Sequence, residues 1–126
     1  MNTQLFIALS LTGLAAFNVQ AACLTTAHPY SGIVQPHSTT TAHGPVTVIN
    51  GSRCRSVIIE ATIEKLSTGP VPNMTIERLD GAQWTEIAHA YGRNASFIGA
   101  PGTYRVLHRN DTGAPLGYKG STSITR

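Results

Sequence analysis

The chain has 126 residues, a formal net charge of +3 at neutral pH and 12% charged residues. That length allows one hydrophobic core and excludes a large multidomain enzyme. The lysines and arginines are scattered singly and only 6% of the residues are aromatic. This composition excludes the basic stripe or stacking platform of a specific nucleic-acid-binding protein.

The first element along the chain is an N-terminal export signal. The run FIALSLTGLAAF is apolar and of signal-peptide length, and Val19 and Ala21 stand where a signal peptidase reads small residues. We therefore predict a signal peptide over residues 1–21 and a secreted mature chain, periplasmic if the source is bacterial. The alternative, a lipoprotein acylated at Cys23, would favour a leucine-like residue where Gln20 stands. No later apolar stretch reaches the roughly 20 residues that cross a bilayer, which predicts no transmembrane segment.

The mature chain, residues 22–126, is predicted to be a single domain that opens with a polar arm, residues 22–44. The arm is rich in threonine and proline and has no acidic residue, lysine or arginine. Such a composition is typical of extended chain and loops. Its histidines, His28, His37 and His43, lack the close spacing of metal-ligand pairs, so we predict no metal site and no cofactor.

The two cysteines of the mature chain, Cys23 and Cys54, are predicted to form a disulfide. An exported pair meets an oxidising compartment, where a disulfide is the usual state. The alternatives are two buried thiols, or a zinc site shared with histidines. Zinc is disfavoured because no close pair of the CxxC type is present.

Beyond the arm, alternating apolar residues and turn dipeptides indicate an all-β protein. The pattern is clearest in residues 55–66, where Val57, Ile59, Ala61 and Ile63 share one face. A helix is the alternative there, and the β-branched residues favour a strand. The predicted strands are residues 45–50, 55–66, two joined around Asp80-Gly81 within 74–91, 103–109, and a final one near 118–126.

Short strands at intervals of about ten residues favour a small antiparallel β-sandwich. The run ERLDGAQW, followed by APGTYRV, resembles the latter half of immunoglobulin-like and fibronectin type III-like modules of secreted proteins. The resemblance covers residues 74–109 and implies a Greek-key sandwich, with Tyr104 as a corner tyrosine and Trp84 as a core or rim aromatic. The two cysteines lack the spacing around a tryptophan of an antibody-type domain, so the resemblance implies a fold and no functional residue.

The stretch GAPGTYRVLHRNDTG raises the question of whether its polar residues are structural or chemical. Alternation predicts that Tyr104 and Val106 point inward and that Arg105 is a solvated residue of the opposite face. His108 falls on the face of Tyr104 near the strand's end. The structural reading is therefore favoured for this stretch.

We predict a non-enzymatic binding protein that recognises an extracellular protein or a glycan, as an effector, inhibitor or adhesion module. The alternative is a small secreted hydrolase such as a ribonuclease, which needs a general base, a general acid and a cation. Histidine, glutamate and arginine supply these groups, and strands bearing His89 and His108 could be neighbours. The candidate catalytic residues are His89, His108, Arg105, Glu77 and Glu86.

Every asparagine beyond residue 21 stands in a glycosylation sequon. In a eukaryotic host these positions are predicted to carry glycans at exposed loop ends, and in a bacterial host they carry no meaning. The candidate sites are Asn50, Asn73, Asn94 and Asn110.

Overall fold

A computed structural model of the chain describes residues 23–49, 54–66, 68–90 and 92–126. Within these residues it contains eight strands and no helix, so no helix there is long and apolar enough to span a membrane. The predicted signal peptide and Asn50 lie outside the described residues. The strands are β1 (Thr25–Val34), β2 (Ser38–Val48), β3 (Val57–Lys65), β4 (Asn73–Asp80), β5 (Gln83–Ala90), β6 (Asn94–Gly99), β7 (Gly102–Asn110) and β8 (Leu116–Thr125).

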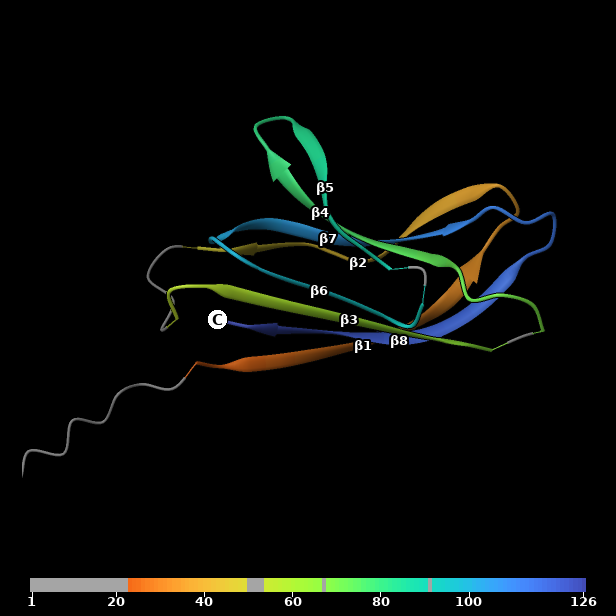
Figure 1. Cartoon of the computed structure of the whole chain (residues 1–126), viewed down its shortest axis with the longest axis horizontal. Coiled ribbons are helices and arrows are strands. Elements are labelled where there is room, and N and C mark those ends of the chain that lie inside the picture. The colour runs from red at the N-terminus through yellow and green to blue at the C-terminus, as the bar shows by residue number, and fades with distance from the viewer. Residues whose placement is uncertain (1–22, 50–53, 67, 91) are drawn as a thin grey trace, which may run out of the picture.

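The strands pair in a nested order: β1 with β8, β2 with β7, β3 with β6 and β4 with β5. The chain is thus one long hairpin rolled upon itself. Further pairing of β3 with β8 and of β4 with β7 completes two antiparallel sheets, β1-β8-β3-β6 and β2-β7-β4-β5, which face each other (Figure 1). This is the strand order of a jelly roll, which contains two Greek keys.

The predicted antiparallel β-sandwich is therefore confirmed, and the strand order defines its type. In immunoglobulin domains strands A and B lie in the same sheet. Here β1 and β2 lie in different sheets, one at the edge of each. The sequence resemblance indicated the correct architecture, and the nested pairing gives the connection pattern of the jelly roll.

The core lies between the two sheets, and β3 shows why the sequence forms it. Val57, Ile59, Ala61 and Ile63 are buried with at most 1% of their surface exposed, as the alternation predicts. Met74 and Ile76 of β4 face them from the other sheet. The helix alternative for residues 55–66 is wrong, because β3 pairs on both sides with β6 and β8.

The prediction of a polar arm over residues 22–44 needs correction, because most of this segment is sheet. Residues 25–34 form β1 and residues 38–48 extend β2 well before the predicted start at residue 45. Both strands are edges, and β2 contains irregularities in its pairing with β7. An edge strand has one hydrogen-bonded neighbour and largely exposed side chains, so it lacks the apolar alternation that identified β3.

Two features of the stretch from Gly99 to Gly113 are structural; the first, the inward Tyr104 and Val106, is as predicted, whereas the burial of Asn110 contradicts the exposed loop end predicted for this sequon. Tyr104 and Val106 are buried, and the Tyr104 hydroxyl donates a hydrogen bond to the Ala100 carbonyl, as in a tyrosine corner. Asn110 is fully buried, and its Nδ2 donates to the carbonyl oxygens of Val34 and Ala114 at 3.1 and 2.7 Å. Asn110 thus holds the turn before β8 against β1.

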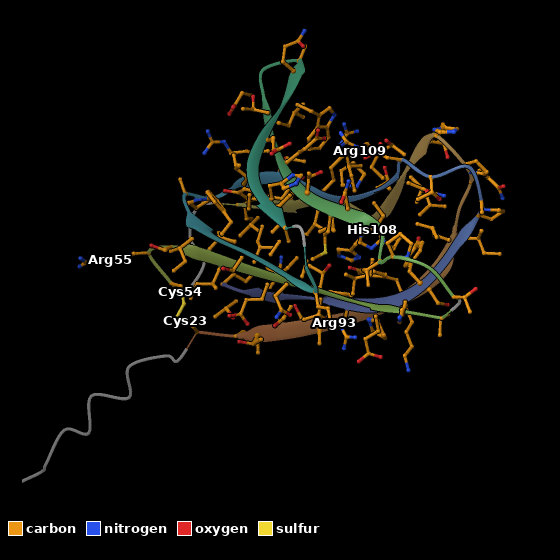
Figure 2. The ribbon with its side chains drawn as sticks, turned by 45° about the vertical axis from the view of Figure 1, so that its right-hand side comes forward. Cys23, Cys54, Arg55, Arg93, His108 and Arg109 are labelled. Carbon is orange, nitrogen blue, oxygen red and sulfur yellow. A yellow bond between two sulfur atoms is a disulfide. The ribbon has the colours of Figure 1, made fainter. Side chains whose placement is uncertain are left out.

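A disulfide joins Cys23 to Cys54, with 5.4 Å between their Cα atoms, as predicted (Figure 2). It lies just before the first residues of β1 and β3. The bond therefore fastens an edge strand to the strand that supplies much of the core.

Candidate functional site

The outer side of the β2-β7-β4-β5 sheet carries a cluster of charged and aromatic side chains that we call the polar face. It consists of Glu77 from β4, Trp84, Glu86 and His89 from β5, and Arg105 and Arg109 from β7. On β4 and β7 the alternating neighbours Ile76, Val106 and His108 are buried, and the register sets Glu86 of β5 opposite Glu77, which places the cluster on the solvent side of the sheet. Four of the five predicted catalytic candidates meet here: His89, Arg105, Glu77 and Glu86.

Arg105 is the centre of the polar face. It stands directly across from Glu77 in the β4–β7 register, and its Nε lies 2.6 Å from Glu77 Oε2. Its guanidinium carbon lies 4.1 Å from the centroid of the Trp84 ring, a cation–π contact. Only 26% of the Arg105 side chain is exposed, so the prediction of a merely solvated arginine is wrong.

A β-bulge places Glu86 and His89 on the same side of the sheet. In a regular strand, residues three apart point to opposite faces. Here Ile76 pairs with Ala88 and Glu77 with Glu86, so Ile87 is the extra residue. His89 Nδ1 and Glu86 Oε1 consequently lie 3.4 Å apart.

A hollow of about 180 Å³ opens in the polar face between β2, β7, β4 and β5. Beside it, Arg109 Nε lies 3.0 Å from Asp111 Oδ1, and Asn73 Nδ2 donates to Asp111 Oδ2 at 2.9 Å. Each guanidinium of this region is therefore paired with a carboxylate. The hollow is lined by Thr39, Asn73, Thr75, Glu77, Glu86, His89, Leu107 and Arg109.

His108, the fifth candidate, lies apart from the others. It is fully buried between the sheets, whereas its neighbour Arg109 points outward (Figure 2). The strands of His89 and His108 are not neighbours, because β4 lies between β5 and β7. Alternation and strand order thus exclude a site that contains both histidines.

The surroundings of His108 are aromatic. Its ring lies 5.5 Å from the ring of Tyr30 and 4.5 Å from that of Tyr118, and its Nδ1 lies 3.1 Å from the Leu107 carbonyl oxygen. Burial lowers the pKa of His108 to about 4, against the smaller opposing effect of that carbonyl. The imidazole is therefore neutral at neutral pH and serves packing.

The β4–β5 hairpin extends out of the sandwich at the top of Figure 1 and carries Trp84. Arg78 Nε lies 2.9 Å from Asp80 Oδ1 beside the turn. Gly81 has a φ of 64°, which the predicted Asp80-Gly81 turn requires. Trp84 lies beyond this turn and is half-buried by Arg105, so it is a rim aromatic.

The three histidines of the N-terminal segment do not converge. His28 and His43 stack across the β1–β2 edge with 4.7 Å between ring centroids, while His37 is exposed in the turn before β2. Burial, with the nearby His28, lowers the pKa of His43. Within the described ranges, no group of three or more histidine, cysteine, aspartate or glutamate side chains is arranged to hold a metal ion.

The sequons fall in three different environments. Asn94 is exposed at the start of β6, and Asn73 is half-buried with its amide bonded to Asp111. The amide of Asn110 is buried and donates twice to backbone carbonyls, so attachment of a glycan would require this turn to open. Exposure in the fold therefore supports Asn94 over Asn110 as an acceptor.

The sequence analysis did not identify Trp84 and Arg109 as members of the polar face, or Asp111 and Asn73 as the residues beside Arg109. Alternation along β7 could have placed Arg105 and Arg109 together, since both are odd-numbered positions facing outward. The meeting of β5 with β7 side chains depends on the position of β4 between them, which no local pattern reveals. In comparisons with known proteins, no family model and no curated protein sequence matches this chain.

Proposed function

We propose that this is an exported, non-enzymatic binding protein and that its contact surface for an extracellular protein is the polar face. The observation that carries the proposal is the position of Arg105, held between the Glu77 carboxylate and the Trp84 ring. Tryptophan and arginine are the residues most enriched among those that dominate protein interfaces. A pair already ordered in the free protein loses less conformational entropy when a partner binds.

The charge and shape of the polar face support a protein partner. Both guanidiniums are paired with carboxylates, so the face offers no excess positive charge to a phosphate or nucleic acid. The hollow of about 180 Å³ is large enough for a side chain of the partner, and the Glu86 carboxylate, 55% exposed, is positioned to accept hydrogen bonds from it. The projecting β4–β5 hairpin makes Trp84 accessible to a second protein.

Export is part of this proposal. A disulfide persists in oxidising compartments, and the structure contains one between Cys23 and Cys54. The apolar run before Ala21 has the composition of a signal peptide. Both observations support a secreted protein, periplasmic in a bacterium.

Substitution of the interface anchors tests the proposal. We expect Trp84→Ala and Arg105→Ala to weaken binding by about 2 kcal/mol or more, roughly 30-fold in Kd, because each removes a side chain from the centre of the interface. Arg105→Lys should lose most of the same affinity, since an ammonium cannot keep the planar contact with Trp84. The measurement is capture of extracellular proteins of the source organism on the immobilised chain, followed by titration calorimetry with the captured protein.

The matched controls are Ile98→Ala and Arg55→Ala, which remove an exposed apolar and an exposed basic side chain away from the polar face. Both should bind as the unchanged protein does. A partner that binds the Trp84 and Arg105 variants as tightly as the unchanged protein would contradict the proposal.

A hydrolase is the second candidate, because the Glu86–His89 pair, Glu77 and Arg109 share one hollow. Glutamate and histidine at this distance are suited to general acid–base chemistry. If the protein hydrolyses an extracellular substrate, His89→Ala and Glu86→Gln should each reduce kcat at least about 100-fold. A panel of glycoside, ester and ribonucleotide substrates tests this directly, and turnover that survives both changes would exclude the site.

A further inference from the structure

The outer side of the other sheet, β1-β8-β3-β6, carries a line of short side chains across its strands, three of them polar. The register puts Pro29 of β1 opposite Ser121 of β8, Ser121 opposite Thr62 of β3, and Thr62 opposite Asn94 of β6. The line crosses four strands, about 14 Å at the usual spacing of neighbouring strands. It lies on the face opposite to the polar face.

Two hollows of about 300 and 310 Å³ open along this line and share Thr62. The first lies over β1, β8 and β3, and the second over β3 and β6. Together they form what we call the transverse groove. Its lining residues are Pro29, Tyr30, Thr62, Glu64, Lys119, Gly120 and Ser121 in the first hollow, and Glu60, Ala61, Thr62, Asn94, Ala95 and Ser96 in the second.

The floor of the groove presents hydroxyl groups. Thr62 Oγ1 and Ser121 Oγ lie 3.2 Å apart, and both belong to interior strands of the sheet. A hydroxyl both donates and accepts hydrogen bonds, which matches the hydroxyl groups of a sugar. The floor is fixed by the sheet, so its hydroxyls are ordered before a ligand arrives.

The walls add charged and amide groups, some of which donate hydrogen bonds and some of which accept them. Glu60 and Glu64 supply carboxylate acceptors, Lys119 supplies an ammonium 3.3 Å from Glu64, and Asn94 supplies an amide. Two carboxylates against one ammonium leave the groove with a formal charge of −1. This disfavours phosphate, sulfate and nucleic acid, whereas an uncharged ligand meets no such repulsion.

The groove does not suit an extended peptide. The backbone of β3 and β8 is paired on both sides, and the groove runs across the strands, so a peptide lying in it could not add as a strand along the edges β1 or β6. The isoleucines of this face, Ile33, Ile58 and Ile98, lie outside both hollows, and Tyr30 is the one aromatic side chain among the lining residues. A peptide would therefore find no backbone partners on the floor of the groove, and Pro29 and Tyr30 as its apolar contacts there.

Gly120 keeps β8 close to β3 at the centre of the first hollow. A Cβ at this position would lie 2.1 Å from the Thr62 carbonyl oxygen and 3.0 Å from Tyr30 Cε2. Any other residue would push β8 from β3 or displace the Tyr30 ring. The hollow thus depends on a glycine at this position of β8.

We propose that the transverse groove is a binding site for a short neutral oligosaccharide. The site is independent of the polar face and of the protein partner proposed for it. A chain with both sites can hold a glycan on one side of the sandwich and a protein on the other.

The test is a titration of the ¹⁵N-labelled, disulfide-bonded chain, made without N-glycans, with cellotriose, maltotriose and triacetylchitotriose, followed by NMR. We expect at least one sugar to cause saturable shifts at the amides of residues 60–64, 94–96 and 119–121. Thr62→Val and Ser121→Ala should each raise Kd about fivefold, because each removes one neutral hydrogen-bonding group. Ser123→Ala, one row away on the same face of β8, should leave Kd within a factor of two.

Every outcome decides the proposal. Shifts at the groove that weaken in the Thr62 and Ser121 variants, with a native-like spectrum for each variant, support it. Absence of saturable shifts with all three sugars at millimolar concentration overturns it, as does a sugar response that maps to Trp84 and His89. Saturable binding of an unstructured serine- and glycine-rich peptide to the groove, with no response to sugars, would identify a peptide site instead.

Discussion

The double change Cys23→Ser and Cys54→Ser is expected to lower the free energy of unfolding by about 3 to 4 kcal/mol. The cysteines are 31 residues apart in the sequence, so the disulfide closes a long loop in the unfolded chain and limits its conformational entropy. This is a large fraction of the total stability of a small domain. Equilibrium unfolding in urea, monitored by the fluorescence of Trp84, measures the change.

The control is Ser56→Ala, an exposed change beside Cys54, which should alter the unfolding free energy by less than about 0.5 kcal/mol. Reduction of the unchanged protein should reproduce the loss seen in the double variant. A loss below about 1 kcal/mol would mean that the segment before β1 is held by its sheet contacts and not by the disulfide.

Acidification is expected to destabilise the fold through His108. The pKa of His108 is about 4 in the folded chain and about 6.5 in an unfolded one, so the unfolded state binds more protons between these values. The contribution of His108 to the unfolding free energy is fully present above pH 6.5. It falls as the pH decreases toward 4, by about 3 kcal/mol for a pKa shift of this size. Tyr30 and Tyr118, whose rings face His108, stay neutral throughout and offer no counter-charge.

Unfolding free energies at pH 7 and pH 4 test this prediction in the unchanged protein and in His108→Leu. The unfolding free energy at pH 7 exceeds that at pH 4 in the unchanged protein, and in the variant this difference should be smaller by most of 3 kcal/mol, whatever the absolute stability of the variant. His43 also has a lowered pKa, so a smaller slope of the same sign should remain. His37→Asn, at an exposed turn residue with a φ of 52°, should keep the full pH dependence, and an unchanged slope in His108→Leu would exclude His108 as its source.

The part of the fold that sequence predicts is the part with strong local alternation. The segment from Val57 to Ile63 predicts a strand because every second residue is apolar. The dipeptide Asp80-Gly81 predicts a turn because glycine readily adopts the positive φ that the turn needs. The edge strands β1 and β2 lack that alternation, since most of their side chains, including the threonines, are exposed or half-buried. β6 was missed for a related reason, because it is short and lies at the edge of its sheet.

The sequence identified most residues of the candidate site, but it did not predict how they are arranged. Glu77, Glu86, His89 and Arg105 were all candidates, and the structure gathers them. Their meeting depends on the long-range order β7-β4-β5 and on the extra residue Ile87, which turns Glu86 and His89 to one side. Neither feature is visible in a short sequence motif. The sequence analysis therefore treated the strands of His89 and His108 as possible neighbours, although His108 lies on the opposite side of the sheet.

The transverse groove was not predictable from sequence at all. The line of residues along it consists of single serine, threonine, proline and asparagine residues from four strands, and each is ordinary in its own segment. Only the register of the whole β1-β8-β3-β6 sheet places them in line. Sites built across strands in this way are visible only once the pairing is known.

The central claim, that the polar face is the contact surface, is tested most directly by site-specific photo-crosslinking. A photoreactive phenylalanine analogue replaces Gln83 on the β4–β5 hairpin or, as a control, Ser123 on the opposite sheet, and the chain is irradiated in the extracellular fluid of its source. We expect one defined protein adduct from position 83, absent when Arg105→Ala is also present, and no such adduct from position 123. The same adduct from position 123 alone, or an adduct at position 83 that persists without Arg105, would contradict it.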